Sequence, residues 1–264
     1  MPIVVIALAA SVLYLAAAIA LALPSLGRPS LPRSVSLGFA GLAVLCHALV
    51  VFGSHRGGVD LHFFAALSTV ALLVGALTLL VNLARPVAGL GVVVFPLAAA
   101  MLLVDTFAPA TQPLPLDWQI KLHVLVALMA YAVLSIAALL AILLALQERA
   151  LRQRHATALV RILPPLTLTE ALLFRLIAAG FVLLTLTLVT GVLFVDNLFA
   201  QHLVHKTVLS VVAWVVFGTL LFGRWRYGWR GKRAVRLTLI GMAVLLLAFF
   251  GSKFVLELLL RRTG

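Results

Sequence analysis

Apolar residues fall into eight long runs along the chain, and short polar or proline-containing stretches separate them. A helix needs about 20 apolar residues to cross a hydrocarbon core of roughly 30 Å. The runs lack the strict alternation of barrel strands, and only helices or closed barrels satisfy every backbone group in lipid. We therefore predict an all-α polytopic membrane protein, a single integral domain over residues 1–264. The expected spans are residues 3–23, 34–52, 62–81, 88–106, 121–146, 171–195, 206–222 and 237–256.

Composition supports a membrane protein, because 64% of the residues are hydrophobic and only 10% are charged. A soluble globular chain of this length does not have that balance. No Lys or Arg precedes the first run, whereas a cleavable signal peptide has a charged start and a shorter apolar core. The first run is therefore predicted to be retained as a helix.

Lys and Arg residues predict the orientation, because they resist translocation and collect in cytoplasmic loops. Most of them lie in the connections after the first, third, fifth and seventh runs, so both termini are expected outside the cytoplasm. The net charge of +13 is explained by basic residues that gather beside the spans and by their attraction to anionic lipid, so no nucleic-acid partner is expected. The predicted cytoplasmic residues are Arg28, Arg33, Arg85, Arg149, Arg152, Arg154, Arg161, Arg224, Arg226, Arg230, Lys232, Arg233 and Arg236.

Histidines show the opposite bias, because only His155 is expected on the cytoplasmic side. Carboxylates lie in loops or near span ends, whereas a proton-coupled pump keeps an acid deep in the bundle. The single Cys46 excludes an internal disulfide and any CxxC motif. Chemistry is therefore expected at the outer face, where the other histidines lie. These are His47, His55, His62, His123, His202 and His205.

Four of these histidines are candidate ligands. His47 lies in the outer half of the second run, where it either hydrogen-bonds a neighbour or binds haem iron or another metal. His123 follows a Trp and a Lys that are typical interface anchors, but anchoring does not explain the histidine. His202 and His205 are three residues apart, a spacing that can chelate a metal and is also common by chance. We predict His47 and His123 as the metal ligands.

Three segments carry a resemblance to a known family. They are LCHALVVFGSHRGG, LHVLVALMAYAVLSIAALLAILL, and a long region from FRLIAAGFVLLTLTLVTGVLFVDNLF through HKTVLSVVAWVVF to YGWRGKRAVRLTLIGMAVLLLAFFGSKFV. In order and spacing they resemble the cytochrome c assembly membrane-protein family of the CcsA and ResC type, and most closely its shorter YpjD-like inner-membrane branch. The resemblance implies a bacterial inner-membrane protein with an intramembrane histidine at His47 and an external haem ligand at His123.

One feature of that family has no counterpart in this chain. Members that attach haem carry a tryptophan-rich external loop ending in WD, and here that place reads FVDNLFAQHLVHK. The aromatic platform for the porphyrin is missing, and the family's second external histidine is not assigned to His202 or His205. The resemblance therefore does not imply the complete synthetase function.

The sequence predicts an apolar groove between helices, with His47 below and His123 at its rim. Haem suits such a site, because its ring prefers apolar walls, its iron takes an imidazole, and its propionates can pair with Lys121, Lys206 or Arg56. The leading prediction is a haem-binding cytochrome c assembly protein with a membrane or assembly partner. A divalent-cation transporter or accessory subunit, and a scaffold without haem chemistry, are the alternatives.

Other motifs predict structure rather than chemistry. There is no phosphate-binding glycine loop, HExxH motif or GxSxG elbow, so no catalytic activity of its own is predicted. Thr167 and Glu170 have capping-box spacing at the start of the sixth run. Gly180, Thr185, Thr187, Thr190 and Gly191 are expected to let a neighbouring helix approach closely and to supply hydroxyls for interhelical hydrogen bonds.

Overall fold

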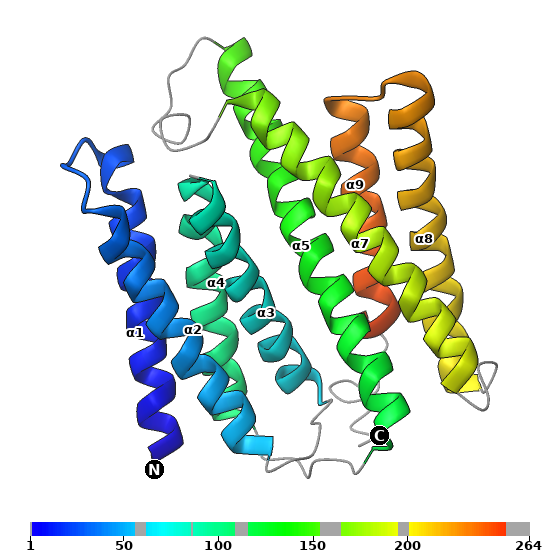
Figure 1. The fold of residues 1–264 in the computed structure, drawn as a ribbon, viewed down its shortest axis with the longest axis horizontal. Coiled ribbons are helices and arrows are strands. Elements are labelled where there is room, and N and C mark those ends of the chain that lie inside the picture. Colours follow the sequence, from blue (N-terminus) through cyan, green and yellow to red (C-terminus); the bar gives the residue numbers. More distant parts are fainter. Residues whose placement is uncertain are drawn as a thin grey trace. The chain divides into compact units, whose positions relative to one another are not determined.

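The computed structural model describes residues 2–55, 62–85, 87–108, 116–153, 165–194 and 201–251. Of these residues 92% are helical and none lies in a strand, which confirms the predicted all-α fold (Figure 1). The elements are α1 (Pro2–Ala22), η1 (Leu23–Leu26), α2 (Arg33–His55), α3 (Phe63–Ala84), α4 (Ala88–Phe107), α5 (Trp118–Arg152), α7 (Leu166–Phe194), α8 (Gln201–Tyr227), α9 (Lys232–Leu246) and the π-helix η2 (Leu247–Gly251).

Eight helices in the described residues are long and apolar enough to cross a membrane, as predicted. Several extend beyond the apolar runs, since α5 continues to Arg152 and α8 begins at Gln201. Hydropathy marks only the part of a helix that lies in hydrocarbon, whereas backbone hydrogen bonding continues into the headgroup region. The expected fifth and seventh spans are therefore shorter than α5 and α8.

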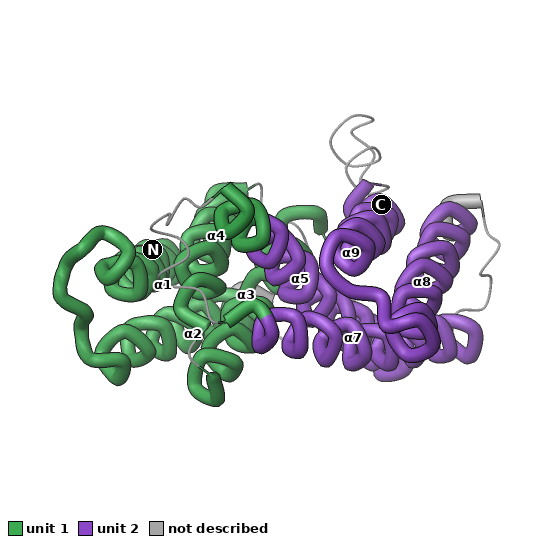
Figure 2. The backbone as a smooth tube through the Cα atoms, turned by 90° about the horizontal axis from the view of Figure 1, so that it is seen from above, with its two compact units in different colours: residues 1–115, 146–166 green, residues 116–145, 167–264 purple. Residues whose placement is uncertain are grey.

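The chain folds into two compact units (Figure 2). The first consists of Met1–Pro115 and Leu146–Leu166, and the second of Leu116–Ala145 and Thr167–Gly264. That both belong to one integral membrane domain stays a prediction.

In the first unit α1 packs against α2 and α4, and α3 also packs against both of these helices. Small residues of α1 form the contact, because Ala7 and Ala10 are fully buried with Leu102 of α4. The opposite side of α1 exposes large apolar side chains such as Val5 and Val12, as expected of a surface that faces lipid tails.

In the second unit α8 and α9 pack along their lengths. Close approach between α5 and α7 depends on Gly180, because a Cβ atom there would lie 2.5 Å from Cδ2 of Leu134. This contact confirms the expectation that small residues of α7 admit a neighbouring helix.

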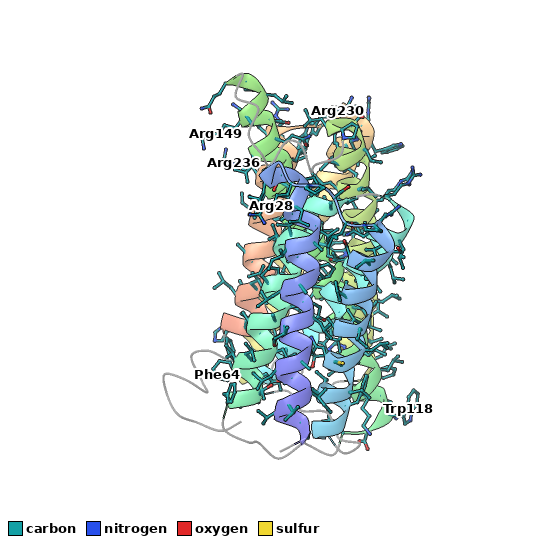
Figure 3. The ribbon with its side chains drawn as sticks, turned by 90° about the vertical axis from the view of Figure 1, so that its left-hand side faces the viewer. Arg28, Phe64, Trp118, Arg149, Arg230 and Arg236 are labelled. Atoms are coloured by element: carbon teal, nitrogen blue, oxygen red, sulfur yellow. The ribbon has the colours of Figure 1, made fainter. Side chains whose placement is uncertain are left out.

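In each unit the two labelled arginines lie at the same end, which we name the basic end of that unit (Figure 3). In the first unit Arg28 and Arg149 lie at the end opposite Phe64, and in the second Arg230 and Arg236 lie at the end opposite Trp118. The predicted sorting of charge along the helices is therefore present within each unit. That the basic ends face the cytoplasm stays a prediction.

Candidate functional site

His47 lies at the centre of a buried polar cluster in the first unit. Its Nδ1 atom is 3.3 Å from the hydroxyl of Tyr14 on α1, and its Nε2 atom is 3.1 Å from the hydroxyl of Ser68 on α3. All three side chains have no exposed surface. The three residues, named here the Tyr14–His47–Ser68 triad, connect α1, α2 and α3 by hydrogen bonds.

Ring contacts support the triad. The Tyr14 ring meets His47 edge-on, with centroids 5.9 Å apart, and stacks on Phe95 at 5.8 Å. Both nitrogens of His47 already have a partner, so binding a metal through either would break a hydrogen bond. A buried hydroxyl left unpaired costs about 1–3 kcal/mol. The geometry thus provides a structural role for His47, and its role as a ligand stays a prediction.

His123 occupies a different environment in the second unit. It is half-buried on α5, and its Nδ1 atom lies 3.0 Å from the hydroxyl oxygen of Thr190 on α7. The Thr190 hydroxyl is also 2.8 Å from the carbonyl oxygen of Leu186. Because a carbonyl oxygen only accepts, Thr190 donates its proton to Leu186 and accepts one from Nδ1–H of His123. In the tautomer that this pattern assigns, the lone pair of the neutral ring lies on Nε2.

The surroundings of His123 lie at the ends of α5 and α7 away from the basic end. A Cβ atom at Gly191 would lie 3.3 Å from Cε1 of His123, so the ring rests against the α7 backbone at a glycine. Trp118 and Phe194 meet with ring centroids 6.2 Å apart. Lys121, predicted to pair with a propionate, is exposed on the first turns of α5.

The remaining predicted site residues are placed only in part. Lys206 of α8 lies with Nζ 5.6 Å from the ring centroid of Phe249 in η2, and His205 is exposed. The helix α8 also includes His202, whose side chain is outside the described residues, as is Arg56. That these residues take part in binding one haem stays a prediction.

The π-helix at the end of α9 has a partner on α5. The hydroxyl of Tyr131 donates a hydrogen bond to the carbonyl oxygen of Leu245, at 2.5 Å. A side chain that occupies a helix carbonyl disturbs the regular hydrogen bonding there, and α9 widens to a π-helix from Leu247 onward. The same segment contains Phe249, the ring beneath Lys206.

Metal sites built only from protein ligands are not found in the described part of the chain. No three His, Cys, Asp or Glu residues there are grouped to hold a metal ion. A zinc site needs three or four protein ligands, whereas a porphyrin supplies its own nitrogens and requires only axial ligands from the protein. The described residues can therefore supply an imidazole to haem more readily than a cage to a free cation.

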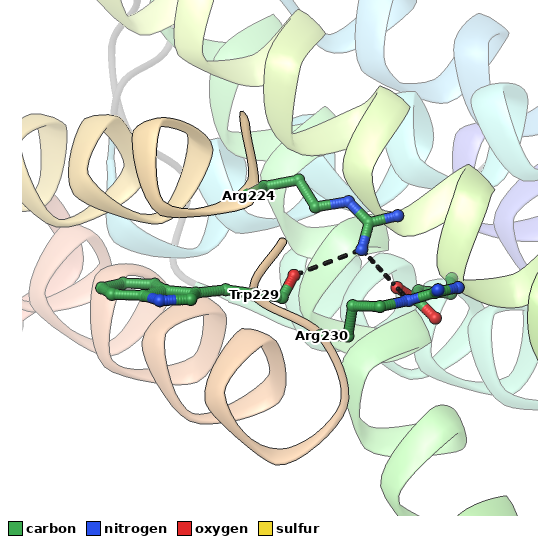
Figure 4. A network of polar contacts seen from close by, with 4 residues as sticks. Arg224, Trp229 and Arg230 are labelled. Atoms are coloured by element: carbon green, nitrogen blue, oxygen red, sulfur yellow. Dashed lines mark hydrogen bonds and ion pairs between the residues drawn. The ribbon is translucent and has the colours of Figure 1, made fainter. Parts of the chain in front are cut away.

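Glu170 corrects one expectation from the sequence. Helix α7 begins at Leu166, so Thr167 lies inside the helix and does not cap it. The Glu170 carboxylate instead accepts hydrogen bonds from Arg224 at 2.9 Å and Arg230 at 2.8 Å (Figure 4). A local spacing rule cannot detect partners so distant in sequence.

The sequence also concealed the partners of both histidines. Tyr14 and Ser68 could be noticed only as polar residues within apolar runs. The hydroxyl of Thr190 was expected to form an interhelical hydrogen bond, but the sequence did not indicate His123 as its partner. Tyr131 had no signal beyond being polar. Each pairing depends on helix rotation and contact, which hydropathy does not specify.

Comparisons with known proteins agree with the resemblance that the three segments carry. The family model for the cytochrome C assembly protein matches residues 34–260. The chain is 34% identical to the inner membrane protein YpjD of Escherichia coli K12, over 86% of this chain and 88% of that protein. It is 35% identical to a 28.8 kDa protein of Azospirillum brasilense, over 85% and 84%. The cytochrome c biogenesis protein CcsA of Guillardia theta is 27% identical, over 56% and 54%. No solved structure matches significantly.

Proposed function

Because the chain belongs to the cytochrome c assembly protein family, we propose that it binds and handles haem at the extracytoplasmic face of a bacterial inner membrane. A relative described as an inner membrane protein and more distant ones described as cytochrome c biogenesis proteins support this proposal. The basic ends of the units would then face the cytoplasm, in line with the bias of Lys and Arg toward that side.

His123 carries the proposal. Its Nδ1–H is held by Thr190, so the lone pair on Nε2 is available to haem iron. A second partner that fixes the tautomer and the ring is the usual arrangement for a histidine that binds a metal. His47 has no nitrogen left over, so we propose His123 as the first axial ligand.

Charge at this end of the second unit suits the propionates of a haem. Exposed Lys121 and half-buried Lys206 are described cations of the second unit that could pair with propionates. We propose His202 and His205 as candidates for the second axial position, since both belong to the same unit as His123. Because the tryptophan-rich loop is missing from the sequence, a partner protein would complete the attachment reaction.

A haem titration of the purified chain tests this function. Wild type should develop a Soret band, and His123→Gly should lose most of it and regain it when free imidazole is added. His155→Ala is the matched control, since it removes a histidine predicted on the cytoplasmic side. A wild-type protein that binds no haem would refute the proposed function, and metal analysis of the same sample would then separate a divalent-cation protein from a scaffold. An unchanged spectrum in His123→Gly would refute the assignment of the ligand.

A further inference from the structure

The connection between α8 and α9 combines a tight turn with a dense group of cations. Gly228 and Gly231 have φ angles of 62° and 53°, in the left-handed region that favours glycine, so the chain reverses within a few residues. We name residues 224–236 the α8–α9 turn. Its cations are Arg224, Arg226, Arg230, Lys232, Arg233 and Arg236.

Glu170 neutralises part of this charge. Arg224 and Arg230 both donate to its carboxylate, and Arg224 also donates to the carbonyl oxygen of Trp229 at 3.3 Å (Figure 4). The hydrogen bond to Glu170 and the negative charge of Glu170 raise the pKa of the Arg230 guanidinium. These contacts fix the turn to α7, within the same unit.

The other four cations have no carboxylate within ion-pair distance among the described residues. All four are exposed, and Lys232 and Arg236 are four residues apart on one helix, where like charges repel. An unneutralised group of this kind is stabilised by an anion from outside the chain.

Aromatic rings hold two of these guanidinium groups in place. Arg226 lies 5.8 Å from the ring centroid of Tyr227, and Arg233 lies 5.8 Å from that of Trp229. The two rings stack on each other, with centroids 6.2 Å apart and planes at 25°. Contact with a ring face leaves the edges of a guanidinium group available, and these edges can donate two parallel hydrogen bonds to a phosphate.

The position of the turn identifies the anion. It joins two helices that can cross the membrane, so it lies at a membrane surface. Trp225 is 81% exposed and Tyr227 is 65% exposed, and such side chains settle at the depth of lipid headgroups. We propose that the α8–α9 turn binds the headgroup phosphate of an anionic phospholipid through Arg226, Arg233 and Arg236.

Native mass spectrometry of the full chain in detergent tests this proposal without haem. Phosphatidylglycerol and phosphatidylcholine with identical acyl chains are added, and the fraction of protein with bound lipid is measured. Wild type should retain phosphatidylglycerol in preference. The triple variant Arg226→Gln/Arg233→Gln/Arg236→Gln should bind it about tenfold or more weakly, since each basic residue near a membrane contributes about 1 kcal/mol.

Two further variants separate a built site from diffuse charge. Arg28→Gln/Arg149→Gln/Arg152→Gln removes the same number of exposed positive charges elsewhere and should reduce binding far less. Tyr227→Leu keeps every charge but removes a ring from the stack, and should also weaken binding. Equal losses in the two triple variants, or no preference for phosphatidylglycerol in wild type, would overturn the proposal, whatever the outcome of the haem titration.

Discussion

The two units surround their histidines differently, both in burial and in the hydrogen-bond partners that they supply. In the first, His47 is fully buried and each ring nitrogen contacts a hydroxyl group from another helix. In the second, His123 is half-buried, and its Nδ1 atom contacts the hydroxyl of Thr190. The sequence offers both as imidazoles in apolar runs, so partners rather than residue type separate a structural histidine from a candidate ligand.

This contrast has an energetic basis. Burying an imidazole costs little free energy when both of its nitrogens are hydrogen-bonded. Removing such an imidazole leaves two hydroxyl groups unpaired. An imidazole that is held through Nδ1–H is oriented and keeps the lone pair of Nε2 for a ligand. We therefore expect substitutions in the first unit to reduce stability, and those near His123 to reduce haem binding.

The largest effect is expected for His47→Ala. The substitution leaves a cavity and deprives Tyr14 and Ser68 of their partner, so unfolding should become easier by about 2–4 kcal/mol. Reversible unfolding in mixed micelles measures this loss. Haem absorbance per folded molecule should stay close to that of wild type.

A second variant isolates the polar contribution. Tyr14→Phe/His47→Leu/Ser68→Ala removes all three polar groups together and should be less destabilised than His47→Ala, because no buried donor or acceptor remains unpaired. If His47→Ala instead keeps its stability and loses haem, the structural role assigned to His47 is wrong.

Long-range pairing explains why the sequence predicted the helices but not these roles. Apolar runs predicted all eight membrane-crossing helices, because hydropathy is a local property. The partners of His47 lie 33 and 21 residues away, and that of His123 lies 67 residues away. Glu170 shows the same limit, since its capping-box spacing predicted a local contact and its carboxylate pairs with Arg224, 54 residues away.

Thr190→Val should produce the next largest effect. Valine has nearly the same shape but cannot accept Nδ1–H, so His123 loses the hydrogen bond that fixes its tautomer. Loss of such a partner weakens metal binding by about tenfold or more. Haem titration measures the change. Thr190→Ser should restore binding.

Thr187→Val is the matched control for that measurement. It removes a hydroxyl of the same helix that bonds the carbonyl oxygen of Leu183, and leaves the hydroxyl partner of His123 in place. Equal haem affinities for Thr190→Val and Thr187→Val would show that the Thr190 hydroxyl does not orient the ligand.

Tyr14→Phe is expected to cost about 0.5–1 kcal/mol of unfolding free energy, the typical contribution of one hydrogen bond between membrane helices. The ring still stacks on Phe95, so the loss reports the hydroxyl alone. Unfolding in the same micelles as before gives the value. A loss as large as that of His47→Ala would mean that Tyr14 supports more than the triad.

The smallest and most selective test uses two glycines that lie equally close to the two sites. A Cβ atom at Gly75 would lie 3.2 Å from the Tyr14 hydroxyl oxygen, and one at Gly191 would lie 3.3 Å from Cε1 of His123. Alanine favours a helix over glycine by up to about 1 kcal/mol, which offsets much of the crowding at either position.

Gly75→Ala should therefore change stability slightly and leave haem titration unaltered. Gly191→Ala should displace the His123 ring and shift haem affinity by a few-fold with little change in stability. If both variants altered haem binding alike, the two histidines would serve one site, and the division of labour between the units would be refuted.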